Sequence, residues 1–104
     1  MKIIINTDKT IDGSQRHRDF YTTQITEELK IYESEITRVD VHVSDQNGIK
    51  DGENDIRCLL EVRIEGKHPI VVTCQADTEE LAIAGAIENL KACLEKVHER
   101  MKNY

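Results

Sequence analysis

The chain has 104 residues, of which 38% are apolar and 33% are charged. This composition excludes wholesale disorder and favours one folded domain spanning residues 1–104. The net charge of -6 disfavours nonspecific nucleic-acid binding, because an acidic chain repels phosphate at long range. It leaves room for a local basic patch, since charges are screened over about 8–10 Å at physiological salt.

Cysteine usage and hydropathy indicate the compartment. Three cysteines without CxxC spacing are typical of small buried apolar residues in a reducing environment. A zinc site is a weaker alternative, with a ligand set of Cys58, Cys74, His42 and His68. The sequence has no run of 18 apolar residues and no secretory leader at its start, so we expect a cytoplasmic protein that binds no membrane, metal or cofactor.

The first third of the chain predicts a strand and a helix. Residues 2–7 are short and β-branched, which indicates a strand, and residues 8–13 form a polar turn. Ser14 is a favourable N-cap for a helix over residues 14–31. The helix has an apolar stripe at a spacing of three and four residues, flanked by Phe20 and consisting of Tyr21, Ile25, Leu29 and Tyr32.

The middle of the chain alternates with period two. Val39, Val41 and Val43 mark a half-buried strand. Residues 44–55 are acidic and rich in Gly and Asn, so we expect a mobile hairpin loop there. Residues 56–64 form the clearest strand of the chain, and residues 65–67 turn it back in a second hairpin.

A strand and a long helix complete the predicted order. Pro69 precedes an alternating strand over residues 70–76, where its missing amide does least damage. Asp77 or Thr78 caps the last helix. This helix carries the strongest periodicity in the chain, with apolar residues at Ile83, Ile87, Leu90, Leu94, Val97 and Met101.

The predicted fold class is therefore α+β, in the order β-α-β-β-β-α. A helix joins the first two strands, which predicts that they are parallel, whereas the hairpin-linked strands are antiparallel. We expect a four-stranded mixed sheet with both helices packed on its one apolar face. The opposite face is expected to be mostly polar with mixed charge, and its residues are Arg38, Asp40, His42, Arg57, Leu59, Glu61, Arg63, Val71, Thr73 and Gln75.

Two stretches resemble the ribosome hibernation-promoting factor and RaiA family. Residues 29–41, LKIYESEITRVDV, are similar to that family's L-x-x-Y-x-x-x-I-x-x-V-x-V junction between helix and strand. Residues 90–102, LKACLEKVHERMK, are similar to its L-x-x-x-L-x-K-x-K-x-K-x-x helix end. The element order agrees with the family over nearly the whole chain.

The resemblance implies a function and a set of contact residues. Members of this family bind the small ribosomal subunit in the mRNA and tRNA channel and silence idle ribosomes, through basic residues of both helices that contact rRNA phosphates. The basic positions of the last helix fall on Lys96, His98, Arg100 and Lys102, whereas those of the first helix fall on Ile25 and Glu28. Arg16 and Arg18 could substitute for the lost basic positions at different places in the first helix, and Lys91 adds a charge near those of the last helix. We therefore expect rRNA contacts from Arg16, Arg18, Lys91, Lys96, Arg100 and Lys102.

Other function classes fit less well. The sequence contains no G-x-S-x-G, P-loop or H-E-x-x-H motif, so neither an enzyme nor a small-molecule substrate is expected. A double-stranded RNA-binding domain needs lysines where residues 77–80 read DTEE. The alternative that stays open is a protein-interaction or regulatory module, which would bind a protein partner or a second copy through the mixed-charge sheet face or an edge strand.

Overall fold

The structure is a computed structural model that describes residues 1–8, 14–45 and 55–102, without the side chains of residues 98 and 100–102. Its elements follow the predicted β-α-β-β-β-α order with one added 3-10 turn, η1. They are β1 (Lys2–Thr7), α1 (Gln15–Glu28), η1 (Lys30–Tyr32), β2 (Ile36–Asp45), β3 (Ile56–Ile64), β4 (Ile70–Ala76) and α2 (Glu79–Lys102).

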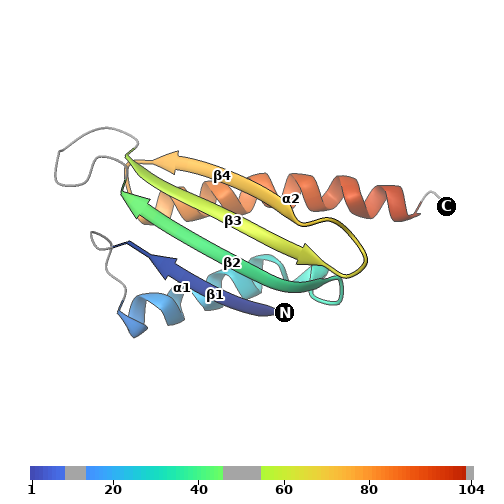
Figure 1. The fold of residues 1–104 in the computed structure, drawn as a ribbon, viewed down its shortest axis with the longest axis horizontal. Coiled ribbons are helices and arrows are strands. Elements are labelled where there is room, and N and C mark those ends of the chain that lie inside the picture. Colours follow the sequence, from blue (N-terminus) through green and yellow to red (C-terminus); the bar gives the residue numbers. More distant parts are fainter. Residues whose placement is uncertain (9–13, 46–54, 103–104) are drawn as a thin grey trace.

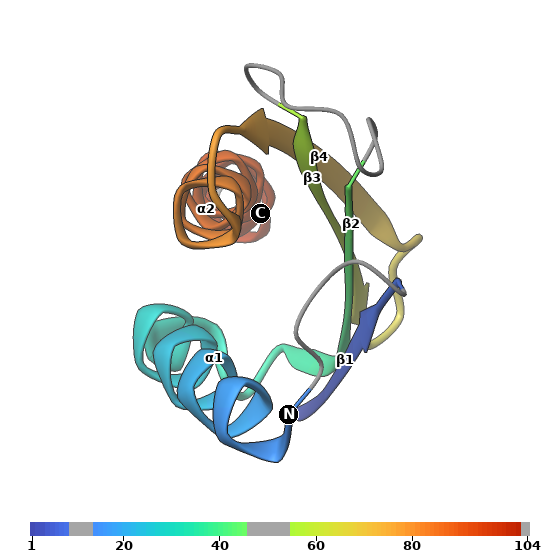
Figure 2. The same cartoon turned by 90° about the vertical axis from the view of Figure 1, so that its left-hand side faces the viewer.

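The four strands form one sheet in the order β1-β2-β3-β4 (Figure 1). The β1 and β2 strands are parallel, and both remaining pairs are antiparallel, which confirms the predicted mixed sheet. Figure 2 shows α1 and α2 on the same side of the sheet, with α1 nearer β1 and α2 facing β3 and β4. The predicted two-layer α+β architecture is thus confirmed.

The core lies between this sheet face and the helices. Alternate residues of β2 and β3 point inward and are almost fully buried, because the pleat sends successive side chains to opposite faces. The apolar seam of α2 packs against them. The largest fully buried side chains of this core are Ile25, Leu29, Leu60, Ile83, Ile87, Leu90 and Leu94.

The caps and ends of the helices refine the predicted bounds. Ser14 Oγ accepts a hydrogen bond from the His17 amide, as expected, and Thr78 rather than Asp77 supplies the side-chain cap of α2, accepting from the Leu81 amide at 3.1 Å. Helix α1 ends at Glu28 rather than at residue 31. The following 3-10 turn, with three residues per turn, keeps Tyr32 on the same buried side as Leu29.

The predicted loop at 44–55 is shorter than expected. Ser44 and Asp45 belong to β2 and pair with Arg57 and Ile56. The Asp45 amide also donates a hydrogen bond to Asp8 Oδ2 at 2.8 Å. This bond to a side chain stabilises the end of β2. The rest of that loop, residues 46–54, lies outside the described residues, and so does most of the turn at 8–13.

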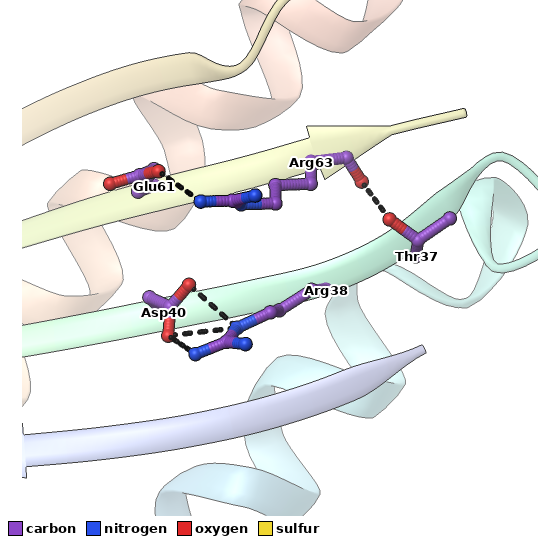
Figure 3. Close-up of polar contacts among 5 residues, drawn as sticks. All are labelled: Thr37, Arg38, Asp40, Glu61 and Arg63. Carbon is purple, nitrogen blue, oxygen red and sulfur yellow. Dashed lines mark hydrogen bonds and ion pairs between the residues drawn. The ribbon is translucent and has the colours of Figure 1, made fainter. Parts of the chain in front are cut away.

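The outer sheet face carries the expected mixed charge in an ordered arrangement (Figure 3). The register places Arg38 opposite Arg63 and Asp40 opposite Glu61, which juxtaposes like charges across strands. Each arginine instead pairs along its own strand: Arg38 Nε lies 2.9 Å from Asp40 Oδ2, and Arg63 Nη2 lies 3.5 Å from Glu61 Oε1. Asp40 lies on this face as predicted, but it is only 8% exposed.

One glycine is fixed by packing between α2 and β4. A Cβ built on Gly85 would collide with Cys74 Sγ. The absence of a side chain at Gly85 therefore lets the helix approach the strand at this point.

Cys74 is the cross-strand partner of Cys58, which is fully buried. Burial raises the pKa of the Cys58 thiol to about 12, with a smaller effect from Cys74.

Candidate nucleic-acid interface

The two helices run side by side in the same direction and are joined by polar contacts near both ends of α1. His17 contacts Glu79 and Glu28 contacts Lys91. At 1.5 Å per residue, the first contact is separated from the second by about 17 Å along α1 and about 18 Å along α2. The equal rise shows that the helices are parallel along this length, so their N-termini lie at one end of the molecule (Figure 1).

The N-terminal contact centres on Glu79, the first residue of α2. Its Oε1 accepts a hydrogen bond from Tyr21 Oη at 3.1 Å and lies 3.2 Å from His17 Nδ1. Burial raises the pKa of Tyr21, and the negative charge of Glu79 raises it further. The tyrosine therefore stays protonated and remains a donor. This cluster fixes the start of α1 against the start of α2.

The second contact engages a predicted rRNA ligand. Lys91 Nζ donates to Glu28 Oε2 at 2.7 Å and lies 3.9 Å from Glu88 Oε1. The hydrogen bond to Glu28 raises the pKa of Lys91, so its ammonium group is fully charged at neutral pH. Lys91 thus belongs to an ion pair between the helices, and a phosphate would have to compete with Glu28 for it.

The other predicted cations are more available. Arg16, Arg18 and Lys96 are exposed, and within the described residues none of them forms an ion pair. Arg100 and Lys102 occupy the last turns of α2, which extend past the sheet in Figure 1, but their side chains lie outside the described residues.

These cations form two groups rather than one patch. Arg16 and Arg18 lie at the start of α1, beside the start of α2, whereas Lys96 is roughly 25 Å further along the helix axes. Lys91 lies between the two groups but is paired with Glu28. The spacing of the two groups suits a ligand whose negative charges are spread along the length of the helices, as they are on an RNA backbone.

Sequence reasoning missed two features of this region. By sequence alone, Glu79 is only an acidic residue at a favourable position in the first turn of α2, whereas in the structure it joins the helices through His17 and Tyr21. Phe20 flanks the apolar stripe in the sequence, yet it is 55% exposed in the structure. The exposure of Phe20 could be predicted from helical periodicity. Adjacent residues are rotated by 100° about the helix axis, and Tyr21 takes the inward position.

The alternative zinc set does not assemble. Cys58 is buried on the inner sheet face, while His42 is exposed on the outer face. Across residues 1–8, 14–45 and 55–102, no three His, Cys, Asp or Glu residues gather where they could hold a metal ion. In the same residues, no helix is long and apolar enough to cross a membrane.

Fold and site together define a two-layer domain whose two parallel helices carry two separated groups of cations. Its sequence matches the family described as sigma 54 modulation protein / S30EA ribosomal protein over residues 4–102. The chain belongs to this family, and the resemblance found in its sequence is confirmed.

Solved structures share the same fold at low sequence identity. The Protein Y N-terminal domain of Thermus thermophilus is 15% identical, with a TM-score of 0.72 over 93% of this chain and 99% of that one. A ribosomal subunit interface protein from Coxiella burnetii is 17% identical, with a TM-score of 0.70 over 95% of this chain and 99% of that one. No curated protein matches the chain significantly.

Proposed function

We propose that this protein is a cytoplasmic, ribosome-associated factor that silences translation by binding the small ribosomal subunit. The observation that carries the proposal is membership of the S30EA family across residues 4–102. The naming of the Coxiella burnetii relative as a ribosomal subunit interface protein supports it. The role is one of binding, not of catalysis.

The proposed contacts are electrostatic. Arg16 and Arg18 at the start of α1 and Lys96, Arg100 and Lys102 near the end of α2 would neutralise rRNA phosphates and release their counterions. Lys91 would join them once Glu28 no longer holds it. Such contacts fix the position of the protein on the RNA, but they do not distinguish one base sequence from another. Because the chain is acidic overall, these local cations oppose a repulsive net charge, and binding should weaken steeply with salt.

Co-sedimentation with purified small subunits across a salt series tests the proposal. The R16Q/R18Q variant should weaken binding and reduce the slope of log affinity against log salt by roughly 1.5, or about 0.7–0.9 per phosphate contact. The matched control K2Q/K67Q removes the same charge from exposed sites in β1 and the β3–β4 turn. If both variants lose the same affinity for small subunits, the loss reflects net charge and not the position of Arg16 and Arg18. If the wild-type protein does not co-sediment with small subunits at low salt, the proposed function is refuted.

The alternative is a module that binds a protein or its own copy. It is favoured by the ordered charges of the outer sheet face, Arg38–Asp40 and Arg63–Glu61, and by the position of β1 and β4 at the sheet edges. Sedimentation velocity would reveal self-association, and capture of partners with and without RNase would separate protein from ribosomal targets. Partners that persist after RNase treatment would favour this alternative.

A further inference from the structure

Phe20 is an exposed aromatic side chain between two depressions at the start of α1. It is 55% exposed, although the adjacent Tyr21 is buried. The larger depression, of about 490 Å³, is lined by Arg16, Asp19, Phe20, Thr23, Gln24 and Glu27. The smaller, of about 230 Å³, is lined by Arg16, His17, Phe20, Tyr21 and Glu80. Arg16 and Phe20 are thus the two residues common to both depressions.

The phenyl ring of Phe20 is in edge contact with a neighbour that is itself held in place. Tyr21 packs edge-on against Phe20, with the ring centroids 5.2 Å apart at 78°. Tyr21 is itself held by the hydrogen bond to Glu79 at the start of α2. The Phe20 ring is therefore packed against a rigid junction of both helices. Its side chain loses little additional conformational freedom when a planar ligand stacks on it.

Arg16 gives this aromatic surface a cation at a defined position. It precedes Phe20 by four residues, which places the two side chains on the same helical face with Cβ atoms about 5–6 Å apart. That separation is comparable with the one between a nucleobase and its own phosphate. Aromatic rings stack on unpaired bases, and arginine binds phosphate, which is the usual pairing in single-strand recognition.

We propose that Phe20 and Arg16 form a site for one unpaired nucleotide of ribosomal RNA, with the base stacked on Phe20 and the phosphate bound by Arg16. The inference rests on the proposed function and names the ligand of this end of the interface. The carboxylates of Asp19 and Glu27 in the larger depression and of Glu80 in the smaller one repel phosphate. Arg16 is therefore the side chain that the RNA backbone contacts. The carboxylates accept hydrogen bonds from amino groups, which favours cytosine, guanine or adenine over uracil.

Substitutions at Phe20 separate stacking from other contacts. Phe20→Ala should weaken binding to small subunits by roughly 5- to 150-fold, the range that stacking on one base supports. Phe20→Trp should retain wild-type affinity, because a larger aromatic ring still stacks. Phe20→Leu should be as weak as Phe20→Ala. The matched control is Val71→Ala, which truncates an equally exposed side chain on the outer sheet face and should change nothing.

The chain contains no tryptophan, so Phe20→Trp also provides a single fluorescent reporter. Its emission should be quenched by small subunits and by a short single-stranded RNA, whereas Val71→Trp should respond to neither. Wild-type affinity in Phe20→Leu would indicate apolar packing against a ribosomal protein and would overturn the site. Unchanged binding by Phe20→Ala would overturn it while leaving the proposed function intact.

Failure of the proposed function gives a different result. If wild-type protein does not bind small subunits, the Phe20→Trp response to single-stranded RNA tests the nucleotide site alone. Quenching by the RNA, reversed by adding Arg16→Gln to the same protein, would retain the site without the ribosome. An unchanged emission would overturn the nucleotide site as well as the proposed function.

Discussion

Replacing Glu28 by glutamine tests whether the ion pair between the helices limits RNA binding. The substitution preserves side-chain shape and helix propensity but removes the charge that holds Lys91 at 2.7 Å. The paired side chains are 43% and 34% exposed. A pair in this environment contributes about 0.2–1 kcal/mol, so E28Q should lower the free energy of unfolding by no more than about 1 kcal/mol and leave the protein folded.

The same change should strengthen binding to small subunits. Lys91 becomes available for one more phosphate contact, which steepens the dependence of log affinity on log salt by about 0.7–0.9. The affinity gain should therefore shrink roughly threefold between 50 and 200 mM salt. K91Q alone should have little effect, because Glu28 already occupies the ammonium group. In the E28Q background, K91Q should remove the gain.

Quantitative co-sedimentation of the four proteins of this cycle, at both salt concentrations, measures the coupling directly. The control is E33Q, which removes one negative charge from an exposed residue after η1. Urea unfolding of each variant verifies that stability stays within the expected margin. Equal gains from E33Q and E28Q, or a gain in E28Q that survives K91Q, would refute the release of Lys91 as the cause.

Three further predictions concern stability. G85A should destabilise the native protein through its collision with Cys74 Sγ, whereas in a C74A background it should stabilise by about 1 kcal/mol through helix propensity; equal signs in urea unfolding would contradict the packing argument. Because the pKa of Cys58 is raised to about 12, the unfolded thiol ionises first as pH rises above its ordinary 9.0. Unfolding free energy should then fall by up to about 1.4 kcal/mol per pH unit, and C58A should flatten this slope between pH 9 and 10. R16Q/R18Q should raise stability by about 0.3–1 kcal/mol per charge, since cations oppose the dipole at a helix start, while weakening subunit binding; a joint loss of stability and binding would contradict separate roles.

Much of the fold was predictable because local signals agree with the global arrangement. The alternation in residues 56–64 and the seam from Ile83 to Leu94 specify one face each, and burial of those faces leaves few alternative topologies. The errors occur where tertiary contacts override local pattern. Helix α1 ends early because η1 buries Tyr32, and β2 continues to Asp45, whose amide finds an acceptor in Asp8.

The site was less predictable, because charge composition does not reveal partners. In the sequence, Lys91 and Arg16 are equally suited to bind phosphate. Only the packing of α1 against α2 shows that Lys91 faces Glu28, whereas Arg16 has no ion pair among the described residues. Similarly, Phe20 and Tyr21 are adjacent aromatics. Their opposite exposures follow from which side of α1 meets the core.

The two groups of cations differ in what their positions imply. Those near the end of α2 complement the helix dipole and have a structural explanation without any ligand. Arg16 and Arg18 stand at the positive end of α1, and this helix has no acidic residue in its first turn and no basic residue in its last. Both charges therefore destabilise α1. They lie beside an exposed Phe20 that contributes little to the core. Since neither feature is explained by stability, the start of α1 is the part of this surface where a ligand is most strongly indicated.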